Sequence, residues 1–492
     1  MAIILALGVA GFFAKTQLDA HAEGDQPTQT EATNSQIENE EPEYTDDDFV
    51  IVKNANQLYD AFAAGYNVRL GNHITLNYTL TISQNQKLDL NGRPLYGEKY
   101  IRDKYDEMIR IENGATLTIL DGSTYQDGYI GEHLSRGTVG CINVAQGHLI
   151  LDSGTIYKNK AYAVDIPELT TKMAGGVYIA SGSTFTMNGG TISENSVIGG
   201  FVESFATQYD ISTCHGVYVD SDATFTQNGG SIRDNKPTDI SGGMSNWAYS
   251  PHSTAGGVYV AKEATYNLIG EGTAVTGNCG VSFNYIEPVR SNFEYDNNNC
   301  AGGIYIAEGG NCNISNSKVE GNYGFSDYEA AGGIYNLGTL NIENSSVSAN
   351  EVLKQTEKIV YTTYYFYNKI GAGAIINSST AESRGNCIIK SSKIDENLVY
   401  SMHCAIGAIY NNGYLEINSE GSTGTATTVN NNRVFLDDSN PLYERVAFIG
   451  GVYNTTTNEG QDAYFKFKEG QICANSATVY YSKLSSIAYG GL

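Results

Sequence analysis

The stretch Gly176-Val-Tyr-Ile-Ala-Ser-Gly-Ser-Thr-Phe-Thr-Met-Asn-Gly-Gly-Thr-Ile-Ser-Glu-Asn195 decides the fold. It contains the tripeptide Gly-Val-Tyr, a short strand in which Phe185 and Met187 lie two residues apart, and an Ile followed three residues later by Asn. These three parts recur in the same order from about Gly140 onward. A unit repeated in this way is typical of a solenoid, in which each repeat forms one coil.

The first part has the form Gly-Val/Ile-Tyr. Full matches begin at Gly176, Gly216, Gly257, Gly303, Gly333 and Gly451, and the variants are Ala408-Ile409-Tyr410 and Ala374-Ile375-Ile376. The second part spaces its apolar residues two apart, as at Leu149 and Leu151 or Leu340 and Ile342. This spacing predicts strands whose apolar side chains point to one face.

The third part is the most regular, since Asn follows an Ile or Val at the same offset of three each time. The residues are Asn159, Asn195, Asn235, Asn278, Asn322, Asn350, Asn397, Asn432 and Asn475. When coils stack one strand spacing apart, such side chains can hydrogen-bond to their equivalents and to the turn backbone. We therefore expect a structural Asn ladder at one corner of the coil, not a catalytic role.

Three strands and three turns per repeat predict an all-β chain folded as a right-handed parallel β-helix of about ten to twelve coils. Before the repeats, Asn54 is a helix N-cap, Leu58 and Phe62 lie four residues apart, and Gly65 is a stop signal. This pattern predicts a short amphipathic helix over 55–64 that caps the first coil.

The distance from each ladder Asn to the next Gly-Val/Ile-Tyr varies, so we expect the insertions to leave the coil at one corner. They span 196–214, 236–255, 279–301, 351–371 and 433–449. They contain Trp247 and the aromatic run Tyr361, Tyr364, Tyr365, Phe366 and Tyr367. Long variable loops of this kind are where recognition is expected.

The Tyr of each first part should point away from the bore if the preceding Val or Ile points into it, because neighbours in a strand alternate faces. Outward rings would form an amphipathic surface suited to sugars or to a partner protein. Alternatively the rings only stack on one another and stiffen the sheet, or they turn inward as core. The candidate binding residues are Tyr178, Tyr218, Tyr259, Tyr305, Tyr335, Tyr410, Tyr453 and Trp247.

The charge of 29 Lys and Arg against 54 Asp and Glu, a net −25, disfavours nucleic acid as a partner. The eight cysteines show no CxxC pair or metal-ligand spacing, and the histidines form no cluster, so we predict no metal site and no cofactor. Cys312 and Cys387 should be buried in the bore. If any disulfide forms, it should join Cys279 to Cys300, which bracket one insertion.

The first 22 residues hold a short apolar run followed by Ala20-His-Ala22, which predicts a signal peptide over 1–22; an uncleaved N-terminal anchor is the alternative. Residues 23–49 are polar and acidic and predict a disordered linker. The β-helix domain then covers 50–492, with no membrane span in the mature chain. Because the chain stops at Tyr489-Gly-Gly-Leu492, which opens a new unit, we expect truncation at the C-terminus and either a monomer or end-to-end association.

The repeats resemble those of the pectin-lyase-like superfamily of right-handed β-helices over roughly Val50 to the C-terminus. The elements Phe185-Thr-Met-Asn188 and Phe225-Thr-Gln-Asn228 are similar to repeats of polymorphic outer-membrane and adhesin-type bacterial surface proteins. The resemblance implies the fold, which hosts polysaccharide lyases, glycoside hydrolases and adhesins alike.

The chain departs from the enzyme branches of this superfamily. It lacks the set of Asp, His, Arg and Lys motifs of the polygalacturonase type, and Cys214-His215-Gly216 matches only part of one motif. Glu194, Asp234 and Glu396 each precede a ladder Asn and could pair as carboxylates, but Lys158 and several small residues take the same position in other coils.

We therefore expect a secreted or cell-surface adhesin or stalk that binds glycans, such as a polysaccharide, or cell-surface proteins through its tyrosine face and variable loops. The alternative is a polysaccharide lyase or glycoside hydrolase of the same superfamily. Two or more carboxylates converging with an Arg or Lys would favour the enzyme.

Overall fold

The computed structural model describes residues 43–44, 48–98, 106–162, 172–198, 212–237, 253–282, 298–326, 328–352, 370–400, 404–419, 425–437, 447–455, 463–480 and 488–489. The chain divides into two compact units, 1–41 and 42–492, and all described residues belong to the second. The predicted signal peptide and most of the predicted linker therefore lie outside the described residues.

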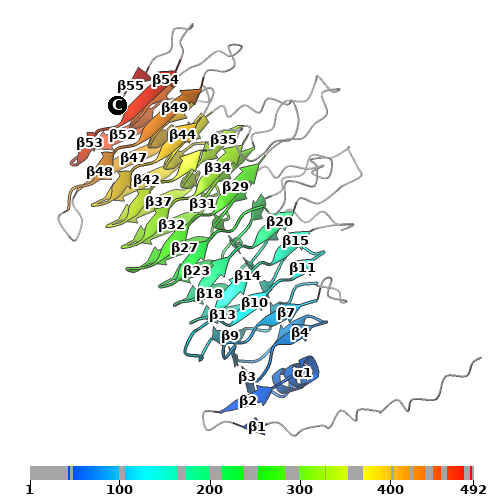
Figure 1. The fold of residues 1–492 in the computed structure, drawn as a ribbon. Helices are drawn as coiled ribbons and strands as arrows, with labels where there is room; N and C mark the ends of the chain where they lie inside the picture. The colour runs from blue at the N-terminus through cyan, green and yellow to red at the C-terminus, as the bar shows by residue number, and fades with distance from the viewer. Residues whose placement is uncertain are drawn as a thin grey trace, which may run out of the picture. The chain divides into compact units, whose positions relative to one another are not determined.

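The second unit is a right-handed parallel β-helix, as predicted from the repeats (Figure 1). Sheet B contributes one strand to each of twelve coils. Every pairing between named strands is parallel, except that β1 pairs antiparallel with β2. Equivalent strands of successive coils lie side by side, from the N-terminal blue end of Figure 1 to the C-terminal red end.

Three long sheets enclose the bore. Sheet A consists of β1 (Glu43–Tyr44), β2 (Phe49–Val52), β3 (Asn67–Leu70), β6 (Gln86–Asp89), β9 (Ala115–Leu120), β13 (Gly147–Leu151), β18 (Thr184–Met187), β23 (Thr224–Gln227), β27 (Thr265–Ile269), β32 (Asn311–Ser315), β37 (Thr339–Glu343), β42 (Asn386–Lys390), β47 (Tyr414–Asn418) and β52 (Tyr464–Phe467). Sheet B consists of β4 (Ile74–Leu76), β7 (Leu95–Gly97), β10 (Tyr129–Gly131), β14 (Thr155–Tyr157), β19 (Thr191–Ser193), β24 (Ser231–Arg233), β28 (Ala274–Thr276), β33 (Lys318–Glu320), β38 (Ser346–Ser348), β43 (Lys393–Asp395), β48 (Thr428–Asn430) and β53 (Gln471–Cys473). Sheet C consists of β5 (Leu80–Ile82), β8 (Ile109–Ile111), β12 (Ile142–Val144), β17 (Val177–Ile179), β22 (Val217–Val219), β26 (Val258–Val260), β31 (Ile304–Ile306), β36 (Ile334–Asn336), β41 (Ile375–Asn377), β46 (Ile409–Asn411) and β51 (Val452–Asn454).

Three further sheets form where the insertions begin and end. Sheet D consists of β11 (Leu134–Ser135), β15 (Lys160–Tyr162) and β20 (Ser196–Ile198). Sheet E consists of β16 (Lys172–Ala174), β21 (Ser212–Cys214), β25 (Ser253–Ala255), β30 (Asn299–Ala301), β35 (Glu329–Ala331), β40 (Ile370–Ala372), β45 (Cys404–Ile406), β50 (Ala447–Ile449) and β55 (Ala488–Tyr489). Sheet F consists of β29 (Cys279–Ser282), β34 (Tyr323–Ser326), β39 (Glu351–Val352), β44 (Leu398–Tyr400), β49 (Arg433–Asp437) and β54 (Ser476–Tyr480). Within a coil the chain passes through sheet A, then sheet B, then sheet D or sheet F where the coil has such a strand, then sheet E and finally sheet C.

The strands of sheets E and F were not predicted from the sequence. Cys300, Ala330 and Phe448 of sheet E pack with Val352 and neighbours of sheet F in a second hydrophobic core. The first Gly of each Gly-Gly pair lies at the neck between this core and the bore. At Gly332 a Cβ would lie 2.4 Å from a backbone oxygen of the next coil and 2.6 Å from the Glu351 nitrogen, so only glycine fits without a shift.

The bore is filled by columns of apolar side chains in register. Phe185, Phe225 and Tyr266 are at most 1% exposed, and their rings stack at centroid distances of 4.6 and 4.9 Å. Further along the same column, Cys312 and Cys387 are fully buried, as predicted. Continuous burial of this kind supplies the main driving force for the fold.

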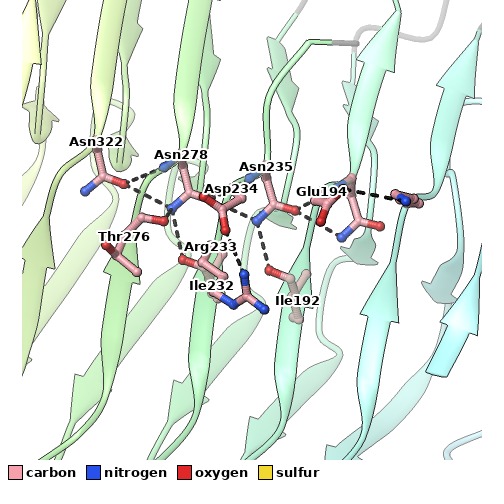
Figure 2. A network of polar contacts seen from close by, with 11 residues as sticks. Ile192, Glu194, Ile232, Arg233, Asp234, Asn235, Thr276, Asn278 and Asn322 are labelled. Atoms are coloured by element: carbon pink, nitrogen blue, oxygen red, sulfur yellow. Dashed lines mark hydrogen bonds and ion pairs between the residues drawn. The ribbon is translucent and has the colours of Figure 1, made fainter. Parts of the chain in front are cut away.

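The Asn ladder is confirmed (Figure 2). The backbone N–H and the Nδ2 of Asn235 both donate to Oδ1 of Asn278, at 3.1 and 2.9 Å, and Nδ2 also donates to the Ile192 carbonyl of the preceding coil at 3.0 Å. The same bonds recur between the other ladder residues. Ladder residues from Asn159 to Asn432 are fully buried. Each satisfies backbone groups that the corner would otherwise leave unpaired.

A second ladder lies at the corner between sheets C and A and was missed in the sequence. Nδ2 of Asn336, Asn377 and Asn411 donates to Oδ1 of the next residue in the series, which ends at Asn454, at 2.6 to 2.7 Å. Each of these residues directly follows the Tyr or Ile of the first repeat part. Only four coils have Asn there, whereas earlier coils have Val or Ile.

The N-terminal end is closed as predicted by helix α1 (Ala55–Ala63). The Asn54 side chain accepts from the Gln57 N–H, Leu58 and Phe62 are buried in the main core, and Gly65 has φ +85°. Strand β1, at residues assigned to the linker, adds a pair to the edge of β2. At the other end, truncation was expected from residues 489–492. Of these the structure describes only Tyr489, the last residue of β55. No helix within the described ranges is long and apolar enough to cross a bilayer.

Replacing Asn278 by Ala should destabilise the solenoid strongly. The change leaves the buried Asn235 donors and the Ile232 carbonyl without partners, and each such group costs on the order of 1 to 3 kcal/mol. We expect an unfolding free energy at least about 3 kcal/mol lower, measured by urea titration, with faster hydrogen exchange in the adjoining coils. Asn313→Ala, on a half-exposed outer face, is the control and should change stability by less than about 1 kcal/mol. Equal losses for the two variants would contradict the structural role of the ladder.

His215 predicts a pH dependence of stability. It takes the place of the first Gly, its Nδ1 accepts the Val197 N–H at 2.9 Å, and its Nε2 has no partner among the described residues. Burial lowers the pKa of His215 from 6.5 to about 3, so between these values only the unfolded chain takes the proton. Stability from this residue is intact above pH 6.5 and falls as the pH drops toward 3.

When the pH is lowered from 7 to 5, the unfolding free energy of the wild-type chain should fall by about 2 kcal/mol more than that of His215→Gly. Glycine is the residue that the neighbouring coils carry at this position, as at Gly175 and Gly256. Replacing the exposed His73 by Ala is the control and should leave the wild-type dependence unchanged. Parallel stability curves for wild type and His215→Gly would show that His215 is not buried in its neutral form.

Candidate functional site

The repeated tyrosines form a column on the outer face of sheet C, stacked from Tyr178 to Tyr335 and interrupted by Ile376 before Tyr410 and Tyr453. The rings of Tyr218 and Tyr259 lie 4.7 Å apart, those of Tyr259 and Tyr305 5.0 Å, and those of Tyr305 and Tyr335 4.9 Å, all within 9° of parallel. They point away from the bore, because Val217 and Val219 on either side of Tyr218 face it.

The expected exposed tyrosine surface is nevertheless wrong for most of the column. Tyr218, Tyr259, Tyr305, Tyr335 and Tyr410 are only 1 to 6% exposed. The reason is sheet E, whose first residues bond the phenols: Ser212 and Ser253 to Tyr218 and Tyr259, and Glu329 to Tyr335. Such buried rings stiffen the sheet and present little surface to a ligand.

Only the two ends of the column, Tyr178 and Tyr453, are half-buried. The Tyr178 hydroxyl donates to Asp220 at 2.6 Å, and Asp220 also pairs with Lys172 at 2.6 Å. Burial, with this hydrogen bond to a carboxylate, raises the pKa of Tyr178. Trp247 and the aromatic run at 361–367 lie outside the described residues.

Below Tyr178 the same outer column of sheet C becomes polar. Arg110 and Asn143 follow one another in register, and Glu107 accepts from both, at 2.8 Å from Arg110 and 3.2 Å from Asn143. Arg110 also lies 3.4 Å from Glu112, whose side chain is 33% exposed. Burial raises the pKa of Glu107, an effect that Arg110 opposes. Two carboxylates thus converge on one guanidinium.

A partly exposed aromatic strip lies on the outer face of sheet B in the first four coils and was not identified in the sequence. We define the strip as His73, Tyr96, Tyr129 and Tyr157, whose ring centroids lie 6.5, 5.7 and 5.4 Å apart in edge-to-face contact. Gly131 pairs with both Tyr96 and Tyr157 and has no side chain, so the Tyr129 ring occupies the space between the rings of Tyr96 and Tyr157. The Tyr129 and Tyr96 hydroxyls are 3.2 Å apart.

Charged side chains border the aromatic strip on the side of the Asn ladder. Tyr129 donates to Glu132 at 3.2 Å, and the Lys158 ammonium lies 4.6 Å from the Tyr157 ring centroid and 3.9 Å from Glu194. Burial and the hydrogen bond to Tyr96 raise the pKa of Tyr129, so it stays a neutral donor. The strip therefore offers ring surface, phenols, a carboxylate and an ammonium group together.

The strip has a weak signal in the sequence. Tyr157 directly follows the Ile of the first ladder unit, and Tyr129 directly precedes Ile130 in a coil whose ladder position is His133 instead of Asn. His133 bonds the carbonyls of Glu98 and Asp106, and Oδ1 of Asn159 in the next coil has no described partner. The repeat was therefore not recognisable in the coils that carry most of the strip.

The column of Glu194, Asp234 and Glu396 has a conformational explanation. All three have φ between 55° and 60°, and the residues at the same corner in other coils have similar positive values, such as 54° at Lys158 and 65° at Gly277. The position is a left-handed turn residue, which favours Gly and Asn, and the charged residues and Ala349 share the same backbone conformation. Within the described ranges no group of three or more His, Cys, Asp or Glu could hold a metal ion.

None of the eight cysteines forms a disulfide in the structure, so the conditional Cys279–Cys300 disulfide is not formed. Cys300 faces sheet F in the second core, whereas Gly280 is the residue of β29 that approaches sheet E. Cys279 packs instead with Val281 and Phe325 on the other face. Alternation of faces along β29 keeps the two sulfur atoms apart.

Comparison of the chain with protein-family models, with curated proteins and with solved structures gave no match.

Proposed function

We propose that this chain is an exported β-helix, secreted or displayed on the cell surface, that binds glycans without chemical turnover. The observation that carries the proposal is the aromatic strip on sheet B. Export is supported by the apolar N-terminal run with its Ala20-His-Ala22 cleavage pattern. The buried tyrosine column is not part of the proposed binding surface.

The strip suits sugars because it joins ring surface to polar groups. Three half-exposed tyrosines and the exposed His73 extend across four coils, and sugar rings pack their C–H faces against aromatic side chains. The phenols of Tyr96 and Tyr129, with Glu132, can exchange hydrogen bonds with sugar hydroxyls. Ring contacts fix the aromatic side chains before binding, which lowers the entropy lost on association.

Binding without chemistry is supported by how the polar residues near the strip are used. Asn159 of the ladder is buried in the corner, where its backbone N–H and its Nδ2 donate to Asn195, and Glu194 lies beside Lys158 at the surface. The long insertions predicted from the sequence remain a proposed binding site for cell-surface proteins.

The double variant Tyr96→Ala/Tyr157→Ala should weaken glycan binding by at least about fivefold, since each ring contact contributes roughly 0.5 to 1.5 kcal/mol. The measurement is a glycan array with the purified chain, followed by titration calorimetry on the best ligand. Tyr125→Ala removes a tyrosine that is 87% exposed and should leave affinity unchanged. No glycan bound by the wild-type chain, or equal affinity for the double variant, would overturn the proposal.

A second candidate, a polysaccharide-degrading enzyme, is favoured by the Glu107–Arg110–Glu112 cluster. A carboxylic acid held protonated by burial can donate to a leaving oxygen while a second carboxylate activates water. The raised pKa of Glu107 and the greater exposure of Glu112 fit these two roles. The side chain of Glu107 is only 4% exposed and paired with Arg110, which favours a structural role.

Assays on neutral polysaccharides and uronate polymers separate the two candidates. We expect neither new reducing ends nor unsaturated products with the purified chain. Turnover that falls by about a hundredfold or more in Glu107→Gln would favour the enzyme. The control is Glu320→Gln, a half-buried carboxylate on the outer face of sheet B away from this cluster.

A further inference from the structure

The outer face of sheet A carries two regular columns of small polar side chains. In five successive coils, β18 to β37, every position of both columns is Thr or Asn. We define this polar array as Thr184, Thr186, Thr224, Thr226, Thr265, Asn267, Asn311, Asn313, Thr339 and Asn341. All of these side chains are half-buried, and the residues between them point into the bore.

The array is a two-dimensional lattice. Its members repeat at about 4.8 Å from coil to coil and at about 6.7 Å along each strand, the distance between alternate residues. Amide groups fix part of it: Nδ2 of Asn341 donates to Oδ1 of Asn313 at 3.0 Å, and Nδ2 of Asn313 to Asn267 at 2.9 Å. Donors and acceptors are therefore held in a repeating order.

Strand propensity alone does not explain this uniformity. Sheet B offers an internal comparison, because the outer positions of its strands belong to the same five coils. They are Thr191, Ser193, Ser231, Arg233, Ala274, Thr276, Lys318, Glu320, Ser346 and Ser348. Charge and size vary there, although a preference of β-strands for Thr would act on both sheets alike.

The composition of the array also selects the type of ligand. It has no charged side chain in a protein of net charge −25, so it does not select an ionic partner. It also has no aromatic ring in these coils, so a single sugar has no platform on which to stack. A regular lattice of hydroxyls and amides instead matches a solid surface that presents its own hydroxyls at regular intervals.

We propose that the polar array binds the flat surface of a crystalline neutral polysaccharide. Many weak hydrogen bonds, each repeated at the coil spacing, then act together, as in multivalent binding. The inference extends the proposed glycan binding to a second face. It stands on the sheet A registers and not on the aromatic strip, so either can fail alone.

The test is sedimentation of the purified chain with microcrystalline cellulose and with crystalline chitin, beside the same polymers in amorphous, swollen form. We expect preferential binding to one crystalline form. Thr186→Val/Thr224→Val removes two hydroxyls while keeping shape and strand propensity, and should weaken that binding by at least about tenfold. Circular dichroism and thermal unfolding check that the variant folds.

The matched control is Thr155→Val/Thr191→Val, which makes the same change at half-buried positions of sheet B and should bind like wild type. Tyr96→Ala/Tyr157→Ala should keep crystalline binding even where soluble glycans are lost. Equal loss in both valine doubles, or no preference for crystalline polymer, would overturn the inference. A third outcome is that the chain inhibits ice growth but binds no polysaccharide, and that only Thr186→Val/Thr224→Val abolishes the inhibition. The ligand of the array would then be ordered water, and the inference would be overturned.

Discussion

The fold depends on the hydrogen bonds that each ladder Asn makes across coils. At a buried corner some backbone N–H and C=O groups have no partner in either adjoining strand. Such unpaired groups lower the stability of the fold when water cannot reach them. Asn278 solves this with one side chain: Oδ1 accepts two donors from Asn235, and Nδ2 reaches the Ile232 carbonyl and Oδ1 of Asn322. Because each residue needs its neighbour, the same amide must recur at the same place in every coil of the ladder.

The fixed register that follows governs the other interactions. Aromatic rings meet their equivalents in the bore, where Phe185, Phe225 and Tyr266 stack, and again on the outer face of sheet C. The glycine neck lets the chain leave the bore and return without breaking this register, as the close approach at Gly332 requires. Sheets E and F are then held in their own stack by the same spacing, with a separate apolar core.

The sequence predicted the features that depend on local spacing and failed where distant segments cover a surface. The ladder, the bore columns and the helix with Asn54 and Phe62 follow from offsets of two, three and four residues. Burial of Tyr218 and Tyr335 depends on strands such as Ser212–Cys214 and Glu329–Ala331, which are short, rich in small residues and separated from the tyrosines by a turn. No periodicity marks these strands, so the tyrosines looked exposed.

Register also separates structural from functional repetition. Apolar side chains in the bore and Asn at the ladder corner are required by the fold, because a polar side chain in the bore or a missing amide at the corner leaves buried groups unpaired. The outer positions of sheets A and B face no such requirement, and on sheet B they differ freely, as Arg233, Thr276 and Glu320 show in three successive coils. Hydrogen bonds between Asn267, Asn313 and Asn341 account for part of the uniformity at the outer positions of sheet A in those coils. Within the described ranges the threonines make no such ladder, and contact with a repeating surface is the cause that we propose for them.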